Sequence, residues 1–444
     1  MDFKEMENDF RETEVGKIPK SWIVNTVGGL VCQNILDKPL DGNHGGIHPT
    51  QSDFTSEGIP FIMASDIVNS EIDYSECKYI TEERSRELKK GFAKEGDVLL
   101  THKATIGRVA LVKEITTPYI VLTPQVTYYR ILNRKILNNE FLKYYFGWCK
   151  FNDLFTAWAQ GGSTRAYLGI TAQQKLPIII PPIEEQKAIA NILSTLDEKI
   201  EINNQINKNL EEMAQAIFKQ WFVEFEFPNE NGEPYKSSGG EMVESEMGMI
   251  PKGWEISALY NLAEYINGTS FKAKDYGEQG LPIIKIAELK NGITDGTKFF
   301  IGKKDNKFYL KNKDILFSWS GNPDTSIDTF IWTKGDAILN QHIFKVLPNE
   351  ESGYYYIYTL LKGMKNTFAN IARNKQTTGL GHVTVKDLKE LKVVVDYTKI
   401  KEFNRVIEPI IEKIINNNKL NEKLSSLRDD LTPKLMSGEI RTIN

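Results

Sequence analysis

The chain has 444 residues, with 55 lysines and arginines against 59 aspartates and glutamates and a formal net charge of −4. Hydrophobic residues make up 41% and charged residues 26%, which is ordinary globular usage and excludes disordered, collagen-like and low-complexity classes. The length is enough for about three domains. The small negative charge argues against DNA binding driven by the chain as a whole, but it is compatible with a local basic face.

The cysteine pattern and the apolar stretches indicate a reducing compartment and no membrane. Cys32, Cys77 and Cys149 lie far apart and form no Cys-x-x-Cys pair, which excludes a disulfide scaffold and a cysteine-based zinc site. Residues 1–10 are acidic and lack the apolar core of a signal peptide. No stretch reaches the ~20 apolar residues that span a bilayer. We therefore expect a cytoplasmic protein without a membrane partner.

In the first part of the chain, short strands are expected before a long helix. Residues 97–100 and 108–112 predict two strands around a loop, and the partial alternation over residues 119–131 predicts one half-buried strand. Residues 181–185 combine two prolines with two glutamates, which is a good helix start. The helical pattern then runs without a breaker to about Phe222.

After this helix, the sequence begins again. Residues 228–240 are rich in Gly, Pro, Ser and Asn and predict a linker. Residues 244–254 then repeat Glu, Glu, Gly, Ile, Pro, Lys and Trp of residues 12–22 at an offset of 232. Three further stretches recur in the same order: 58–62 as 280–284, 96–100 as 313–317, and 176–180 as 391–395. A repeat of more than 200 residues is too long for a solenoid unit, so the chain is a duplicated domain pair.

Each copy ends in a long helix with heptad spacing and polar layers. The heptad positions are Ile189, Leu196, Asn203, Asn207, Leu210 and Ile217 in the first helix and Ile410, Asn417, Asn421, Leu424 and Leu431 in the second. Asparagine aligns with asparagine at an offset of 214, and a buried asparagine fixes the register of a coiled coil. The alternative is two amphipathic helices, each packed on its own domain. Pro409 predicts either a kink or the true start of the second helix.

The combination of these features resembles the DNA specificity (S) subunit of type I restriction-modification systems. The resemblance is carried by the paired Gly-x-Ile-Pro-x-x-Trp openings at 16–22 and 248–254, the hairpin at 96–108, and the stretches 181–190 and 218–225. It implies an α+β fold, in which two pseudo-two-fold-related target recognition domains, strand-rich and mixed α/β, are joined by two long antiparallel coiled-coil helices. The implied segments are a first recognition domain at 1–182, a central spacer helix at 183–227, a linker at 228–247, a second recognition domain at 248–397 and a C-terminal spacer helix at 398–444.

The resemblance also implies a function and a set of partners. The chain would be a non-catalytic subunit that reads an asymmetric bipartite target in double-stranded DNA. Its helices would dock two modification (adenine methyltransferase) subunits and the restriction/translocase subunits. S-adenosylmethionine and ATP/Mg would be bound by those partners, and this chain would hold no cofactor.

A search for catalytic and metal-binding motifs gives no candidate residue. The methyltransferase motif is approached only by Asn322-Pro323-Asp324-Thr325, which lacks a second proline and an aromatic residue and predicts a turn. No Gly-x-x-x-x-Gly-Lys-Ser/Thr motif occurs, so no ATPase is indicated. Two other functions stay open: a structural coiled-coil adaptor that binds proteins without DNA, and a stand-alone nuclease or methylase with degenerate motifs.

Candidate DNA contacts are small, polar or basic residues in loops, because base edges are read by polar side chains and phosphates by cations and amides. In the first copy these are His102, Lys103, Thr105, Gly107 and Arg108 of the hairpin and Ser163, Thr164 and Arg165 of a glycine-containing loop. In the second copy they are Ser318, Ser320 and Asn322 of the matching hairpin and Gln376, Thr377, Thr378 and His382 of the matching loop. Lys303, Lys304 and Lys307 belong to a cationic run that contacts phosphates or forms an ordinary solvated face.

Overall fold

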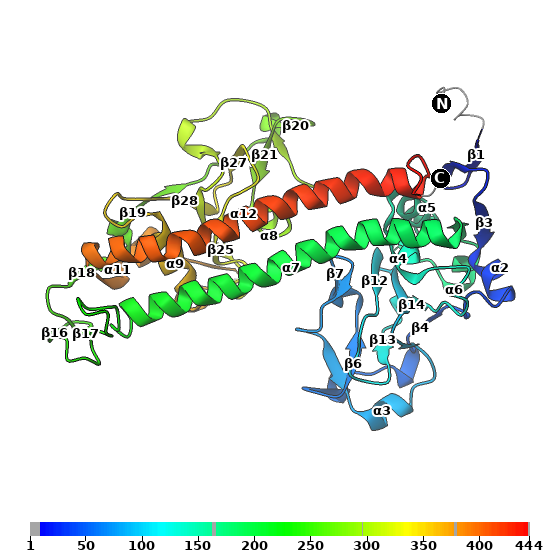
Figure 1. Cartoon of the computed structure of the whole chain (residues 1–444), viewed down its shortest axis with the longest axis horizontal. Coiled ribbons are helices and arrows are strands. Elements are labelled where there is room, and N and C mark those ends of the chain that lie inside the picture. Colours follow the sequence, from blue (N-terminus) through cyan, green and yellow to red (C-terminus); the bar gives the residue numbers. More distant parts are fainter. Residues whose placement is uncertain (1–8, 162–165, 295, 377–379, 443–444) are drawn as a thin grey trace. The chain divides into compact units, whose positions relative to one another are not determined.

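The structure is a computed structural model that describes residues 9–161, 166–294, 296–376 and 380–442. The chain forms two compact units, one made of residues 1–198 and 424–444 and the other of residues 199–423. Each unit contains a strand-rich domain and part of two 40-residue helices, α7 (Ile183–Phe222) and α12 (Tyr397–Met436) (Figure 1). This division differs from the five predicted segments, because both units include helix. None of the helices in the described ranges is long and apolar enough to cross a membrane.

The first unit contains two main sheets. The antiparallel sheet has the order β12–β11–β14–β4, with bounds Thr105–Leu111, Val98–Lys103, Val126–Tyr129 and Leu40–Asp41. The mixed sheet has the order β10–β13–β6–β9–β5, with bounds Phe92–Ala93, Ile120–Leu122, Ile59–Ile62, Lys78–Ile80 and Phe54–Thr55. The smaller pairs are β1–β2 (Phe10–Thr13, Gly16–Pro19), β3–β15 (Ile23–Thr26, Pro177–Ile180) and β7–β8 (Ile67–Val68, Glu71–Ile72).

The second unit repeats this topology strand for strand. Its antiparallel sheet has the order β26–β24–β28–β19, with bounds Asp328–Ile331, Ile315–Ser318, Ile343–Pro348 and Ala263–Asn267. Its mixed sheet has the order β23–β27–β21–β22–β20, with bounds Tyr309–Leu310, Ala337–Leu339, Leu281–Ile284, Phe299–Phe300 and Tyr276–Gly277. In both copies the inner pair is parallel, β6 with β13 and β21 with β27. The duplication predicted from the sequence is confirmed.

Only some of the shorter helices and strand pairs have a counterpart in the other copy. The first unit has α2 (Val27–Cys32), α3 (Glu82–Arg86), α4 (Asn139–Gly147), α5 (Cys149–Gln160) and α6 (Ile170–Gln173). The second has α8 (Ile286–Asn291), α9 (Tyr354–Gly363), α10 (Lys365–Asn374) and α11 (Val385–Glu390), and the pairs β16–β17 (Met242–Ser245, Gly248–Pro251), β18–β30 (Glu255–Ala258, Lys392–Val395) and β25–β29 (Ser320–Gly321, Gly381–His382).

The recurring stretches 96–100 and 313–317 are the same turn and strand in both units. Gly96 has φ +84° and Lys313 has φ +78°, so a lysine adopts the left-handed conformation that glycine adopts more easily. The carboxylates of Asp97 and Asp314 then accept backbone N–H bonds of 2.8 Å from the residues three positions earlier. The predicted strands on either side of the first hairpin loop are confirmed as β11 and β12.

The structure corrects three expectations about elements. Residues 119–131 form two strands, β13 and β14, in different sheets rather than one; all residues of both strands are buried, so their side chains show no regular polar alternation. The predicted linker 228–247 includes β16, which pairs with β17. Pro409 is not the start of the last helix, because α12 begins at Tyr397.

Within the second unit, α7 and α12 run antiparallel through a layer of asparagines. Asn203 Nδ2 donates to Asn421 Oδ1 at 2.7 Å, and Asn417 Nδ2 donates to Asn207 Oδ1 at 2.8 Å. As the residue number rises on one helix it falls on the other, which defines the antiparallel direction. The predicted polar layer is therefore confirmed.

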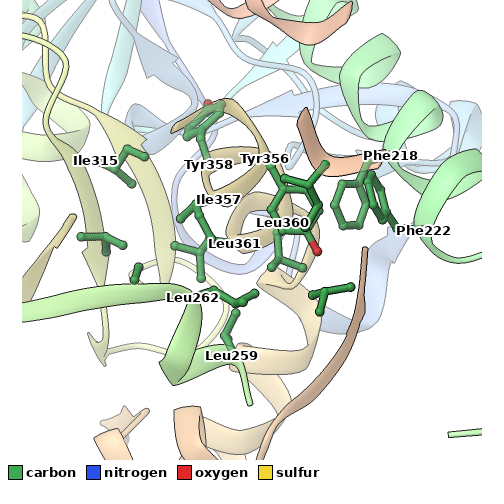
Figure 2. Close-up of a cluster of buried hydrophobic side chains, with 14 of the residues drawn as sticks. Phe218, Phe222, Leu259, Leu262, Ile315, Tyr356, Ile357, Tyr358, Leu360 and Leu361 are labelled. Atoms are coloured by element: carbon green, nitrogen blue, oxygen red, sulfur yellow. The ribbon is translucent and has the colours of Figure 1, made fainter. Parts of the chain in front are cut away.

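The apolar helix positions pack on the domain cores as well. In the second unit the rings of Phe218 and Phe222 lie 5.7 Å and 4.9 Å from the ring of Tyr356 in α9 (Figure 2). In the first unit Ile189 is fully buried in the core that α4 and α5 form, and Leu431 packs against the same core. The helices therefore pair through their polar layer, and each contributes apolar residues to the core of both units, so the alternative of two helices packed separately on their own domains does not hold.

Candidate nucleic-acid interface

The tip of the β11–β12 hairpin presents two of the predicted contact residues to solvent. Lys103 pairs with Thr105 across the tip, and Ala104 between them has φ +63°. A non-glycine residue in this conformation is strained, and such strain persists where the surrounding structure holds it in place. Both Lys103 and Thr105 are exposed. The tip therefore offers a cation and a hydroxyl at a fixed position.

His102 is not a direct contact, which corrects the prediction. Its side chain is fully buried, and Nδ1 lies 2.8 Å from Thr127 Oγ1. Burial lowers the pKa of His102 from 6.5 to about 4, although the carboxylate of Asp41 acts in the opposite direction. The imidazole is therefore neutral at pH 7 and supports the strand beneath the tip. The prediction failed because His102 was assigned to the hairpin loop, whereas it lies in strand β11, whose residues are buried up to Lys103.

Arg108 and Gly107 shape the hairpin. Arg108 is exposed, but its Nη1 donates to the backbone oxygens of Ala64 and Ile67, both at 3.1 Å, so the guanidinium ties the hairpin to a neighbouring segment. Gly107 has φ +81°, and a Cβ there would lie 2.5 Å from Asn152 Oδ1. Their contact with DNA remains a prediction.

The segment that follows the second predicted loop is bonded to this hairpin. Ser163, Thr164 and Arg165 fall outside the described residues. The segment that follows is bonded to the hairpin, since Ala104 N donates to Ala166 O at 3.1 Å and Leu168 N donates to His102 O at 3.0 Å. In the first unit, residues 166–168 therefore lie beside the hairpin.

The second unit brings together the matching two stretches. β25 pairs with β29, so that Ser320 lies opposite His382, and both are half-buried. Val383 N donates to Trp319 O at 2.8 Å, which repeats the bond between Leu168 and His102. Ser318 is fully buried, which corrects its prediction as a contact, because it lies inside strand β24.

The remaining predicted residues of the second unit differ in exposure. Asn322 is exposed, and its Oδ1 accepts the backbone N–H groups of Asp324 and Thr325 at 2.9 Å and 3.2 Å, which confirms the predicted turn. Gln376 is exposed, and Thr377 and Thr378 fall outside the described residues.

The lysine run of the second unit is only partly available. Lys303 and Lys307 are exposed, and Lys307 Nζ lies 3.8 Å from a carboxylate oxygen of Asp305. Lys304 is half-buried and donates to Ser270 O at 3.3 Å. Of the three predicted phosphate contacts, Lys303 and Lys307 have the exposure that this role needs.

Sequence reasoning missed a basic surface in the first unit. A cavity of about 420 Å³ is lined by the cations Lys89, Lys90, Lys94 and Arg130, together with Leu40, Phe92, Tyr119 and Tyr128. Lys90 pairs with Asp41, and Arg130 donates to Asp97 at 2.7 Å, whereas Lys89 and Lys94 are exposed. The signal in the sequence was the close spacing of these three lysines, which resembles any solvated charge cluster.

His44 and His48 of the first unit are engaged in local contacts. His44 Nε2 lies 2.8 Å from Asp41 Oδ2, and His48 Nδ1 lies 3.1 Å from Asn43 O. In the part of the chain that the structure describes, no group of three or more His, Cys, Asp or Glu residues is arranged to hold a metal ion.

Known proteins are similar to this chain in sequence and in fold. The family model of the type I restriction modification DNA specificity domain matches residues 43–212 and again residues 251–426. The MjaIX specificity subunit of Methanocaldococcus jannaschii is 29% identical over 98% of this chain and 97% of its own length. The HindI specificity subunit of Haemophilus influenzae is 26% identical over 86% of this chain and 94% of its own length.

One solved structure supports the fold at low sequence identity. The crystal structure of the type I restriction-modification S subunit from M. genitalium aligns with a TM-score of 0.50 at 16% identity, covering 93% of this chain and 96% of that one. The matched domain occurs twice, in the two units whose topology is repeated. The chain therefore belongs to the family of type I restriction-modification DNA specificity subunits.

Proposed function

We propose that the two domains read the two halves of an asymmetric, bipartite sequence in double-stranded DNA. The observation that carries this proposal is the repeated hairpin and neighbouring segment, which have the same backbone bonds but different side chains in the two units. At the equivalent paired positions, the first copy has Lys103 opposite Tyr167, and the second has Ser320 opposite His382. Equal geometry with unequal chemistry suits two different half-sites.

Exposed lysines supply the contacts that do not depend on sequence. Lys89, Lys94, Lys303 and Lys307 are exposed on the two domains, and cations on phosphates provide most of the affinity of a DNA-binding protein. Because the chain carries a net charge of −4, its affinity for DNA depends on these local groups, and basic partners are expected to raise it.

Two modification subunits and the restriction/translocase subunits are the partners we propose for α7 and α12. Ile202, Ile206 and Met213 of α7 are exposed, with 50%, 37% and 52% of their surface accessible. Their spacing of four and seven residues places them on one face of the helix. Exposed apolar side chains grouped in this way are typical of a protein-binding surface.

In this proposal the chain is non-catalytic, and chemistry occurs on the partners. The modification subunits would bind S-adenosylmethionine and methylate adenine, and the restriction subunits would use ATP and Mg²⁺. The absence of methyltransferase and ATPase motifs from the sequence supports this division of roles.

The test is a map of methylated adenines across the genome of the cell that carries the complete system, with and without the gene for this chain. Loss of one asymmetric bipartite motif on deletion is the expected result, and it would also reveal the recognised sequence. A wild-type map with a bipartite motif that persists after deletion would contradict the proposal.

A further inference from the structure

Each copy contains a second loop at the same place, which sequence analysis did not select. It follows the inner strand of the mixed sheet and consists of residues 123–125 in the first unit and 340–342 in the second. Thr123 N donates to Ile62 O, and Asn340 N donates to Ile284 O, both at 3.0 Å. We call these two stretches the reader loops.

Both reader loops are bonded to the hairpin whose tip was described above. His102 N donates to Gln125 O at 2.9 Å, and Trp319 N donates to His342 O at 3.4 Å. These bonds make Gln125 and His342 structurally equivalent, because each accepts from the residue just before a hairpin tip, His102 or Trp319. The equivalence comes from the backbone and owes nothing to side-chain similarity.

In the first unit, Gln125 lines a cavity of about 280 Å³ that has both apolar and polar lining residues. The lining residues are Phe54, Phe61, Met63 and Pro124 together with His48, Lys103, Thr123 and Gln125. The hydroxyl of Thr123 is buried there without a hydrogen-bond partner. Among the described residues, the half-buried Gln125 amide also makes no side-chain hydrogen bond. A buried polar atom without a partner is unfavourable, so the cavity is suited to a ligand with polar edges.

In the second unit, His342 is exposed and its position is fixed by an aromatic neighbour. Its ring lies 5.7 Å from the ring of Trp319, whose Nε1 donates to Asn267 Oδ1 at 3.1 Å. His342 Nε2 lies 3.2 Å from Gln341 Nε2. The imidazole is thus held beside the hairpin tip while remaining accessible.

We propose that Gln125 and His342 read base edges in the two half-sites, as equivalent specificity-determining residues of the two domains. The proposal rests on the proposed function, because it names the residues by which that function selects sequence. A glutamine amide has a donor and an acceptor side by side and matches N6 and N7 of adenine in the major groove. An imidazole has one donor or acceptor on each nitrogen, so the same position in the second domain reads a different pattern.

The experiment maps methylated adenines in cells that express the chain with its native modification subunits, for wild type, Gln125→Ala and His342→Ala. Gln125→Ala is expected to reduce base preference at least about tenfold at one position of one half-site. His342→Ala is expected to do the same in the other half-site only. Gln33→Ala is the matched control, because Gln33 is exposed at the end of α2 and, among the residues that the structure describes, its side chain bonds Asn25 alone, at 3.2 Å; it should leave the motif unchanged.

The outcomes separate this inference from the proposed function. A wild-type map without a bipartite motif would contradict the proposed function itself. A normal wild-type motif that neither alanine variant alters would overturn the assignment of Gln125 and His342 and leave the proposed function standing. If an alanine variant lost all methylation, Gln125→His and His342→Gln would be measured instead, because each introduces the residue that the other copy has at the equivalent position. Unchanged half-sites in both variants would then overturn the inference.

Discussion

The side-chain amide of Asn203 donates a hydrogen bond of 2.7 Å to the side-chain oxygen of Asn421 across the helix pair of the second unit. The duplication relates this bond to the one that Asn417 donates to Asn207, with the same atoms in the same roles. Asn203 and Asn417 are nearly fully buried, with 2% and 3% of their surface exposed. A buried polar pair of this kind aligns two helices in one register, because any slip leaves an amide without a partner.

Asn203→Leu is therefore expected to destabilise the chain by about 1–3 kcal/mol, since it removes the donor to Asn421 Oδ1, while Asn421 Nδ2 keeps its bond of 2.9 Å to Asn204 Oδ1. The double variant Asn203→Leu with Asn421→Leu is expected to recover most of that loss, because both polar groups are then gone. Urea unfolding measures both values. Asn209→Leu, at an exposed position of the same helix, should change stability by no more than about 0.5 kcal/mol. Additive effects of the two substitutions on the free energy of unfolding would show that the two asparagines do not stabilise one another.

His102 predicts an acid-sensitive first unit. Its folded pKa of about 4 lies below the ordinary 6.5, so between these values the unfolded chain binds a proton that the folded chain does not. Stability is then complete above about pH 6.5 and falls as the pH drops towards 4, by about 3 kcal/mol in total.

Replacing the imidazole should remove that pH dependence. His102→Phe keeps an aromatic ring at this position, as Trp319 does in the second copy, but removes the group that titrates. The variant should have a flatter stability profile between pH 6.5 and 4. Loss of the bond to Thr127 lowers its stability equally at every pH. Urea unfolding at a series of pH values for wild type and variant gives the two profiles. Parallel profiles would mean that His102 does not titrate in this window.

The sequence predicted the architecture well because its strongest signals are periodic and long. The two copies of the opening motif, the proline–glutamate start of α7 and the asparagine layers all recur in the structure. Recurrence at a fixed offset supplies two observations of each feature. Over a helix of 40 residues, the periodic pattern is long enough to identify the helix even where single residues fit it poorly.

The contact residues were harder to predict, because exposure depends on which sheet covers a strand. His102 and Ser318 look like loop residues in the sequence, but each lies in a strand whose two faces are covered. Gln125 and His342 carried no motif, since their equivalence is defined by backbone bonds between segments far apart in the chain. Residue type and local spacing cannot show either property.

Lys303 and Lys313 provide a matched test of phosphate contact. Both are exposed lysines of one unit, but Lys313 Nζ lies 2.7 Å from a carboxylate oxygen of Glu412, whereas Lys303 makes no ion pair among the described residues. Lys303→Ala should weaken binding to all DNA sequences equally and reduce the slope of log affinity against log salt by about 1. Lys313→Ala should have a smaller effect, because its charge is partly neutralised. Titrations of specific and random DNA at several salt concentrations measure the slope for each variant. Equal slopes of log affinity against log salt for the two variants would show that Lys303 does not contact a phosphate.

The helix pair predicts how the spacer between the half-sites can be changed. Removing residues 204–210 of α7 together with the facing residues 414–420 of α12 deletes one heptad from each helix and retains the bond between Asn203 and Asn421. At 1.5 Å per residue each helix is about 10 Å shorter, which corresponds to about three base pairs. The methyladenine map of this variant should show the same two half-sites with a shorter spacer, because the recognition sheets and loops lie outside the deleted residues. The deletion also removes Ile414 and Ile415 from the core of the second unit, so urea unfolding is measured first to establish that the variant folds. Deletion from α7 alone is the control and should abolish methylation, since it sets the asparagines out of register. Altered half-site bases with an unchanged spacer would show that the helices do not set the distance.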